Sequence, residues 1–144
     1  MKLFWFDDER GKIVLWLNRL EADDKVKLCF EERLDRSVQE VKNSEPFDLY
    51  IVDLLTPNGG RIPADLEASV ESMGLGKNTE MGGLLLGHFI LKRDPNSRVL
   101  VVSNTIKPAD ILKEIFPKRV RSVFKGDQRL GAREFFLNQI RQEW

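Results

Sequence analysis

Five side chains that could take part in acid, base or phosphoryl chemistry lie at the C-terminal ends of short apolar segments: Asp7, Asp8, Asp53, Ser103 and Lys125. Carboxylates that meet at neighbouring strand ends repel one another and raise one another's pKa unless a cation compensates them. A hard, oxygen-seeking ion such as Mg²⁺ suits such a cluster. A hydroxyl and an ammonium beside it could neutralise a phosphoryl group that a carboxylate attacks. The set predicts a magnesium-dependent phosphoryl-transfer site.

The segments that must position these groups alternate between two patterns. Apolar, partly β-branched runs predict five strands, at residues 2–6, 25–30, 49–54, 98–103 and 119–124. Apolar residues at helical spacing lie between and after them, beginning near residues 13, 34, 84, 111 and 132. This alternation favours a flavodoxin-like α/β fold, a doubly wound five-stranded parallel sheet of order 2-1-3-4-5 with helices on both faces. Ligands of such sheets bind beyond the carboxyl ends of strands 1 and 3, where the acids lie.

Length and composition limit the classes of protein. A chain of 144 residues with 42% apolar and 32% charged residues predicts one globular domain over 1–144. No run is long and apolar enough to span a bilayer, and the N-terminus lacks the order of a signal peptide, so a cytoplasmic protein without an appended output domain is expected. Cys29 is the single cysteine, which excludes an internal disulfide. Equal numbers of basic and acidic residues, 23 each, predict no direct binding of nucleic acid.

One connection is too long for the pattern. Residues 58–82 follow the third strand, where strand-to-helix loops usually have about two to six residues. Pro63 could begin a short helix there, with Leu66, Val70 and Met73 on one face and Gly74 as its stop. The segment is interpreted either as a surface insertion whose Leu66 face packs on the domain, or as a lid or docking element beside Asp53.

Each polar residue also has a structural interpretation. An aspartate at a strand end is commonly a turn or helix-cap residue, and Asp7 or Asp8 could cap a helix that begins near Glu9. Lys125, which precedes Gly126, could be an ordinary solvated lysine. The joint placement of all five residues at carboxyl strand ends, with none at the opposite edge, favours the functional interpretation.

Four segments give the sequence a family resemblance: "FDDE" at 6–9, "IVDLLTPNGG" at 51–60, "VVSNT" at 101–105 and "VFKG" at 123–126. They resemble the motifs of a response-regulator receiver domain of the CheY-like superfamily, over the whole chain apart from the long insertion. The intervals of 45 residues from Asp8 to Asp53 and 22 from Ser103 to Lys125 are similar to those of the family. The 50 residues from Asp53 to Ser103 exceed the family's interval by roughly twenty, about the excess of the insertion over a normal loop.

The resemblance implies a role for each acid. Asp53 would be the phosphoacceptor, taking a phosphoryl group from a sensor histidine kinase or a phosphotransfer protein. Asp8 would bind Mg²⁺ directly and Asp7 largely through water, while Asp53 and the backbone carbonyl of Leu55 would complete the metal site. The activity would be at most autocatalytic phosphoryl transfer and self-dephosphorylation.

The resemblance also implies how a signal would leave the site. Ser103 would hydrogen-bond one phosphoryl oxygen and Lys125 would pair with another. The hydroxyl would move toward the phosphoryl group and remodel the face made by the fourth and fifth helices of the alternating pattern (near 111 and 132) and the fifth strand. A downstream protein, or a second copy in a homodimer, would read that face.

Three positions depart from the family's pattern. Ser122 stands where receivers often carry an aromatic switch residue, so aromatic switching is not expected. Gly126 follows the lysine where proline is common. Leu55, two residues past the phosphoacceptor, is apolar and would restrict hydrolytic water, which predicts slow self-dephosphorylation.

Other functions are carried as alternatives. The first is a receiver-fold interaction module that phosphorylation does not regulate. A haloacid-dehalogenase-like phosphatase is a minor alternative, because that family needs a second aspartate two residues after its nucleophile, whereas Asp7 is followed at that spacing by Glu9. "GLGKNT" at 74–79 lacks the first glycine of a phosphate-binding loop and follows no strand. His88, the single histidine, is interpreted as a packing residue of an apolar helix.

Overall fold

A computed structural model of the chain describes residues 1–77, 79–126 and 131–144. Its five strands form one parallel sheet of order β2-β1-β3-β4-β5, as predicted. Nearly every side chain of the three central strands is buried, which is what a sheet covered on both faces requires. The strands are β1 (Lys2–Phe6), β2 (Lys27–Glu31), β3 (Leu49–Val52), β4 (Val99–Ser103) and β5 (Val120–Phe124).

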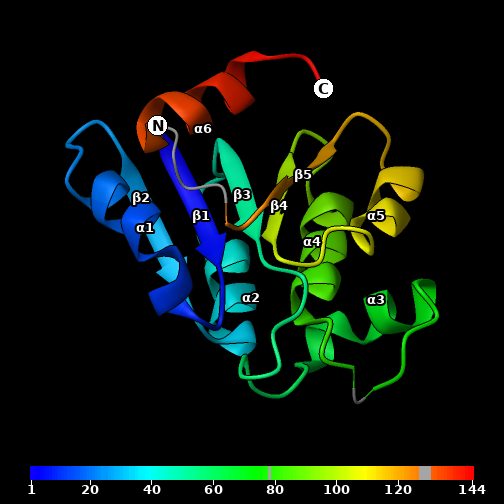
Figure 1. The fold of residues 1–144 in the computed structure, drawn as a ribbon. Coiled ribbons are helices and arrows are strands. Elements are labelled where there is room, and N and C mark those ends of the chain that lie inside the picture. The colour runs from blue at the N-terminus through cyan, green and yellow to red at the C-terminus, as the bar shows by residue number, and fades with distance from the viewer. Residues whose placement is uncertain (78, 127–130) are drawn as a thin grey trace.

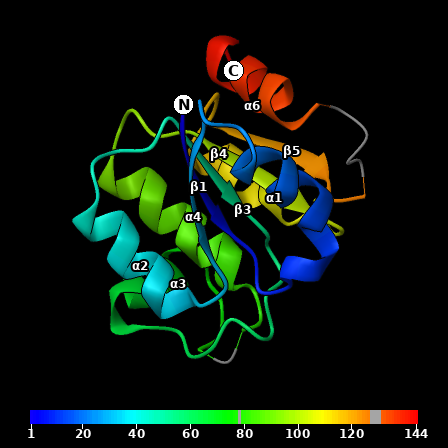
Figure 2. The same ribbon diagram turned by 90° about the vertical axis from the view of Figure 1, so that its left-hand side faces the viewer.

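Two layers of helix cover the sheet (Figures 1 and 2). Helices α1 (Val14–Glu21) and α6 (Ala132–Arg141) pack on one face around Trp5 and Trp16. Helices α2 (Leu34–Asn43), α4 (Gly82–Arg93) and α5 (Ala109–Ile115) cover the other face, over Phe4 and Phe6. A short 3₁₀ helix, η1 (Arg10–Ile13), leads into α1. Alternate residues of β1 point to opposite layers, so each strand contributes to both halves of the core. No described helix has the length and apolarity needed to cross a membrane.

One strand ends earlier than predicted at a functional position. The sequence predicted a strand over 49–54, but β3 stops at Val52 and Asp53 lies just beyond it. Lys125 follows β5, which ends at Phe124, the predicted last residue of that strand. The chain turns away after β3 because Leu54 accepts a hydrogen bond at its carbonyl from Gly83 N, at 3.2 Å, on helix α4 rather than from a neighbouring strand. Both polar side chains thereby stand at the edge of the sheet and not within it.

The long connection after β3 is built into the domain. It contains a 3₁₀ turn, η2 (Ala64–Leu66), and helix α3 (Glu67–Ser72). The helix stops shortly before Gly74, whose φ of +66° is the left-handed conformation that glycine adopts readily. Leu66 and Val70 are buried in the same cluster as α2 and α4. An ion pair of 2.9 Å joins Asp65 to Lys42 on α2. The predicted short helix and its packing face are therefore confirmed.

His88 ties α4 to this connection. Its Nδ1 lies 2.8 Å from the hydroxyl of Ser69 on α3, and its ring packs edge-on against Phe116 at 5.6 Å. The side chain is 3% exposed. Burial, aided by the charge of Lys92, lowers the pKa of His88 below its usual value. The histidine is thus a neutral packing residue of the folded protein.

This burial predicts a pH-dependent stability. Below pH 6.5 the unfolded chain takes up a proton on His88 that the folded chain does not, so the free energy of unfolding should fall by about 1 kcal/mol per pH unit as the pH drops through that range. Denaturant titrations of wild type and His88→Gln at pH 5.5, 6.5 and 7.5 measure the difference. Ser69→Ala keeps the titrating group and should keep the slope. An equal slope in wild type and His88→Gln would contradict the assignment.

Candidate functional site

The parallel ladders bring Asp7 and Asp53 to the same level. Phe6 is in register with Val52, and the pairing continues one residue further because Asp53 N donates to the carbonyl of Phe6 at 3.0 Å. On its other side, Asp7 N donates to the carbonyl of Glu31 at 3.1 Å. The residues that follow β1 and β3 are therefore held by backbone hydrogen bonds, and their carboxylates lie at the carboxyl edge of the sheet.

Lys125 joins these two acids. Its Nζ lies 2.8 Å from Asp53 Oδ2, to which it donates a hydrogen bond, and 2.8 Å from Asp7 Oδ2. All three side chains are at least nine-tenths buried. Lys125 N also donates to the carbonyl of Ser103 at 3.0 Å, which fixes the lysine backbone beside the end of β4. The lysine is not a solvated surface residue, and its ammonium is the cation that compensates the two carboxylates.

Asp8 completes the cluster from a different direction. Its Oδ2 accepts a hydrogen bond of 2.7 Å from the backbone N–H of Asn58, in the loop after β3. Its Oδ1 is buried and accepts no hydrogen bond from the described residues. Carboxylate oxygens of Asp7, Asp8 and Asp53 lie within 4.8 Å of one another. Two adjacent acids and a third one 45 residues further along the chain thus converge on one point.

Burial and mutual repulsion perturb the titration of the cluster. Burial raises the pKa of Asp7 to about 6, the charge of Asp53 adds to the shift, and the contact with Lys125 opposes it. Burial also raises the pKa of Asp8, against the effect of the Asn58 N–H. Burial works to lower the pKa of Lys125, but the hydrogen bonds and charges of Asp53 and Asp7 outweigh it and raise that pKa. The site holds more negative charge than one ammonium balances.

These residues fit a divalent cation. Mg²⁺ takes oxygen ligands and is usually held by one or two carboxylates together with water. The cluster offers three carboxylates. Asp8 Oδ1 is a buried oxygen that has no hydrogen-bond donor in the described part of the chain, and a cation would satisfy it. An ion there would also offset the burial and the repulsion by Asp53 that raise the pKa of Asp7 and Asp8.

The remaining predicted residues lie at the same edge. Ser103 is the last residue of β4, in register with Phe124, and is 2% exposed. Its hydroxyl accepts a hydrogen bond of 3.3 Å from Thr105 N. Leu55 lies two residues past Asp53, and its side chain is 42% exposed. The role of the Leu55 carbonyl as a metal ligand stays a prediction.

Neither capping interpretation accounts for Asp7 or Asp8. Helix η1 begins at Arg10, and the residue before it, Glu9, provides no side-chain cap. Asp7 Oδ1 does accept a hydrogen bond from Glu9 N, at 2.8 Å, but its other oxygen faces Lys125. The carboxylate of Glu9 itself pairs with Lys12 at 2.9 Å. Glu9 is therefore not part of the acidic cluster, which weakens the comparison with the phosphatases.

Sequence reasoning missed two residues that shape the site. Gly83 lies so close to the loop after β3 that a Cβ there would stand 1.5 Å from the carbonyl oxygen of Asp53. Asn58 acts through its backbone N–H, which any residue except proline would supply. The "GG" at the start of α4 could have indicated the close approach of backbone at Gly83. No feature of the sequence indicated the role of the Asn58 N–H.

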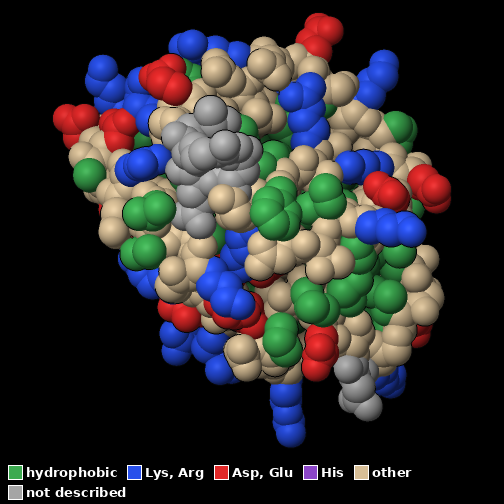
Figure 3. All heavy atoms as spheres, in the orientation of Figure 1, with side chains coloured by type: hydrophobic (Ala, Val, Ile, Leu, Met, Phe, Trp, Pro, Cys, Tyr) green, Lys and Arg blue, Asp and Glu red, His purple; other side chains and the backbone are tan. Residues whose placement is uncertain are grey.

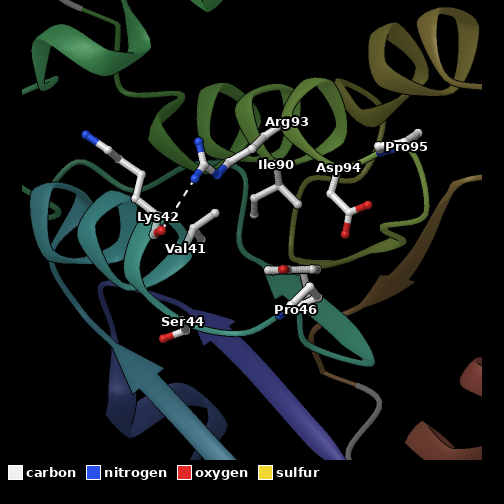
Figure 4. A pocket seen from close by; sticks show the side chains of 9 residues that line it. Val41, Lys42, Ser44, Pro46, Ile90, Arg93, Asp94 and Pro95 are labelled. Carbon is white, nitrogen blue, oxygen red and sulfur yellow. Dashed lines mark hydrogen bonds between the residues drawn. The ribbon is translucent and has the colours of Figure 1, made fainter.

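A further cavity lies away from the acidic cluster. It has a volume of about 440 Å³ and is bounded by the end of α2, the start of β3 and the end of α4 (Figure 4). Its floor includes Val41 and Ile90, and the Tyr50 hydroxyl there already accepts a hydrogen bond from Phe47 N. The acids stand at the opposite edge of the sheet. The cavity is therefore separate from the acidic cluster.

Comparison with protein-family models and with curated proteins finds no match to the sequence. Solved structures do match. The receiver domain of CheB from Thermotoga maritima is 19% identical with a TM-score of 0.61, the match covering 99% of this chain and 95% of that one. The isolated receiver domain of RcsB from Salmonella enterica serovar Typhimurium, solved with the phosphomimetic BeF₃⁻, is 18% identical with a TM-score of 0.61 over 100% of this chain and 91% of that one.

The chain has the receiver-domain fold. A longer RcsB structure from Salmonella typhimurium, described for its conformational dynamism in DNA interaction, is 16% identical with a TM-score of 0.62, and the match covers 100% of this chain but only 62% of that one. The chain thus spans less than two thirds of the length of that response regulator. The likeness confirms the predicted fold resemblance over essentially the whole chain.

Proposed function

We propose that the protein is a two-component receiver domain over residues 1–144 that accepts a phosphoryl group on Asp53 in a Mg²⁺-dependent reaction. The observation that carries the proposal is the convergence of Asp7, Asp8 and Asp53 within 4.8 Å, with Lys125 bridging two of them. A structural ion pair would need one acid and one base. Three buried acids around one ammonium leave a net negative site that a divalent cation and a phosphoryl group would complete.

Each residue then has a defined task. Asp53 Oδ attacks the phosphorus of a phosphohistidine or small phosphoryl donor, a P–O bond forms, and the bond from phosphorus to the donor's leaving group breaks. Lys125 turns its ammonium from the carboxylate toward a phosphoryl oxygen, and Ser103 donates its hydroxyl hydrogen to another. Asp7 and Asp8, with the Leu55 carbonyl, hold the metal ion, which when bound neutralises charge on the transferring group.

A labelling experiment tests the proposal. The protein is incubated with acetyl phosphate with and without Mg²⁺ and examined by intact-protein mass spectrometry. A labile phosphoryl adduct is expected on wild type with Mg²⁺, and neither on Asp53→Asn nor after chelation. Asp48→Asn, an exposed aspartate at the other end of the same strand, is the matched control and should be labelled like wild type. No adduct together with no binding of beryllofluoride would contradict the proposal, and an adduct on Asp7 would revive the phosphatase.

Leu55 predicts the lifetime of the adduct. Its side chain is exposed beside the site and offers no polar group to position a water for attack on the phosphoryl group. Leu55→Asn should shorten the half-life of the adduct by roughly threefold to tenfold, because the amide could position a water molecule for attack and so speed hydrolysis. Loss of label after donor removal measures the rate. The control is Ile106→Asn, because Ile106 is about as exposed as Leu55, and it should leave the half-life of the adduct unchanged. Leu54→Asn is unsuitable as a control because Leu54 is buried.

The surface of α5 and β5 supports the proposed partner site. Figure 3 shows hydrophobic side chains at the surface on the face of the molecule that is turned to the viewer. Ile111 and Ile115 on α5 and Phe124 at the end of β5 are 37%, 42% and 56% exposed. Apolar residues exposed beside a switching loop suit a downstream protein or a second copy of the chain. A sensor histidine kinase or phosphotransfer protein would approach the acidic cluster itself.

A specific contact favours the interaction module as a second candidate. Ser122 occupies the position of the expected aromatic switch, and its Oγ accepts a hydrogen bond of 2.8 Å from Lys113 Nζ on α5. This contact holds α5 against β5 without any contribution from the acidic cluster. If it also holds the partner surface fixed, phosphorylation would not change binding. An unchanged NMR spectrum of α5 and β5 on adding beryllofluoride, with binding at Asp53, would favour this candidate.

A further inference from the structure

The outer strand β2 carries unpaired backbone groups along its free edge. It pairs only with β1 in the described sheet, over its whole length. Lys27 N donates to the carbonyl of Met1 at 2.8 Å, and the last carbonyl of the strand accepts from Asp7 N at 3.1 Å. Successive residues of a strand direct their backbone groups to opposite sides, so the N–H and C=O of Leu28 and Phe30 point away from the sheet. These groups have no hydrogen-bond partner within the described residues.

The side chains of β2 give its two faces different characters. Figure 2 faces this side of the molecule, with α1 and α2 on either side of the strand. Leu28 and Phe30 are half-buried and pack against the α1 layer, whereas Cys29 packs against the α2 layer. Lys27 and Glu31 share the face of Cys29, because side chains alternate along a strand. A free strand edge with apolar side chains is a template for pairing with another strand.

A hollow with an excess of acidic side chains adjoins the end of β2 on the α2 side. It has a volume of about 370 Å³ and is lined by Glu31, Asp35, Arg36, Gln39, Glu40 and Pro63. Asp35 is paired with Arg33 at 3.1 Å, but Glu31 and Glu40 form no ion pair with the described residues. Burial raises the pKa of Glu31, Arg36 opposes that rise, and the charge of Glu40 adds to it. An ammonium from another chain would therefore be stabilised beside Glu31.

We propose that β2 is a dimer interface, at which it pairs antiparallel with β2 of a second copy of the chain about a two-fold axis at Cys29. This pairing places Leu28 opposite Phe30 of the second copy, and Phe30 opposite its Leu28. Each of these pairs exchanges two backbone hydrogen bonds through the groups that point away from the sheet. The two sheets then form one continuous sheet, and the free edge is removed.

Charge complementarity selects this register. With the axis at Cys29, Lys27 of each copy lies opposite Glu31 of the other, on the face that holds the acidic hollow. With the axis one residue later, Lys27 would lie opposite Arg33, a like charge, and with the axis one residue earlier it would lie opposite Cys29. A lysine on a strand edge usually discourages pairing. Here the second copy supplies a counterion for it.

This interface is separate from the surface of α5 and β5. Strands β2 and β5 are the two opposite edges of the sheet, so a dimer through β2 leaves the α5 and β5 surface free for a partner. The interface uses neither Mg²⁺ nor Asp53, and it does not depend on the proposed function. A single pair of short strands makes a small interface, so the dimer belongs to the weak, reversible class.

Association is tested by sedimentation velocity of the whole chain from about 10 µM to about 1 mM, a range that covers weak interfaces. Wild type and Asp53→Asn should dimerise equally. Lys27→Glu and Glu31→Lys should each weaken the dimer about tenfold or more, because each places like charges at both symmetric pairs. An equimolar mixture of these two variants should dimerise like wild type, since opposite charges then meet at both pairs. Recovery in the mixture also shows that both variants fold.

Charge changes at the other edge of the sheet serve as controls. Lys107→Glu and Glu114→Lys make the same changes on exposed residues before and within α5, and they should dimerise like wild type. Wild type that stays monomeric over the whole range would overturn the proposal. A mixture of Lys27→Glu and Glu31→Lys that associates no more tightly than either variant alone would do the same. Equal weakening by the two control variants would place the interface on α5 instead.

Cys29 reports the register of the dimer. Opposed residues of a non-hydrogen-bonded antiparallel pair have Cα atoms about 4.5 Å apart, within the range of about 4.4–6.8 Å that a disulfide spans. Burial raises the pKa of the Cys29 thiol to about 11, so oxidation is run at alkaline pH with copper phenanthroline, which takes two electrons from the two thiols. A covalent dimer is expected for wild type and none for Cys29→Ser. Cross-linking of Leu28→Cys/Cys29→Ser but not of wild type would overturn the register.

Discussion

Replacement of Gly83 by alanine is expected to lower the free energy of unfolding by about 3 kcal/mol or more. The new methyl group would stand 1.5 Å from the carbonyl oxygen of Asp53. That oxygen belongs to the backbone, so no side-chain rotation relieves the clash. Helix α4 or the loop after β3 must move, and the hydrogen bond from Gly83 N to the Leu54 carbonyl is then lost. Denaturant unfolding followed by circular dichroism measures the difference.

A matched substitution isolates this effect. Gly11 lies in η1 with nothing within 4 Å of the position of a Cβ, so Gly11→Ala makes the same chemical change without a clash. Its free energy of unfolding should differ from wild type by less than about 1 kcal/mol. If Gly83→Ala were as stable as Gly11→Ala, the close approach of α4 to Asp53 would be wrong. Where Gly83→Ala still folds, its displaced Asp53 should also be labelled more slowly by acetyl phosphate.

The fold could be predicted because its signals are local and repeated. Segments such as "LYIV" and "VLVV" are apolar without alternation, which indicates strands buried on both faces. Helical spacing between them then leaves a doubly wound parallel sheet as the simplest arrangement. The strand ends were less predictable: Leu54 is apolar and buried like a strand residue, yet its carbonyl bonds to Gly83. A residue's partner depends on the tertiary structure, and no local pattern reveals it.

In the inserted segment, too, the local structure could be predicted and the tertiary contacts could not. Leu66 and Val70 share a helical face, and that spacing was enough to predict a short helix with one buried side. Its attachments were not predictable, because Ser69 with His88 and Lys42 with Asp65 pair residues 19 and 23 positions apart. His88 was correctly taken as a packing residue. Its hydroxyl partner could be named only once α3 and α4 were seen in contact.

The candidate site follows from topology more than from any single residue. Parallel strands place the residues that follow them at one edge of the sheet. Once the strand order was predicted, the proximity of Asp7, Asp8 and Asp53 could therefore be predicted as well. The position of Lys125 after the fifth strand predicted an ammonium beside the carboxylates, but its contact with both Asp7 and Asp53 was not predicted. The roles of these residues in phosphoryl transfer remain predictions that the labelling experiment decides.

Replacement of Lys125 by methionine should lower the free energy of unfolding at pH 7 by about 3 kcal/mol, because it leaves Asp7 and Asp53 buried without their cation. The pKa of Asp7, already raised to about 6, should rise further once the opposing contact is lost. The folded variant then binds a proton that the unfolded chain releases, so its stability falls as the pH increases through 7. Denaturant titrations at pH 6, 7 and 8 measure both effects.

Mg²⁺ should reverse this loss. The ammonium of Lys125 repels a divalent cation at the acids, so its removal should tighten Mg²⁺ binding. MgCl₂ at about 10 mM should therefore raise the free energy of unfolding of Lys125→Met more than that of wild type. Phosphoryl labelling should nevertheless fall by about a hundredfold, because a positive group that neutralises the transferring phosphoryl oxygens is missing. Lys107→Met removes an exposed lysine and should show neither effect. A variant that Mg²⁺ stabilises no more than wild type would show that Lys125 does not compensate the acids that bind the metal.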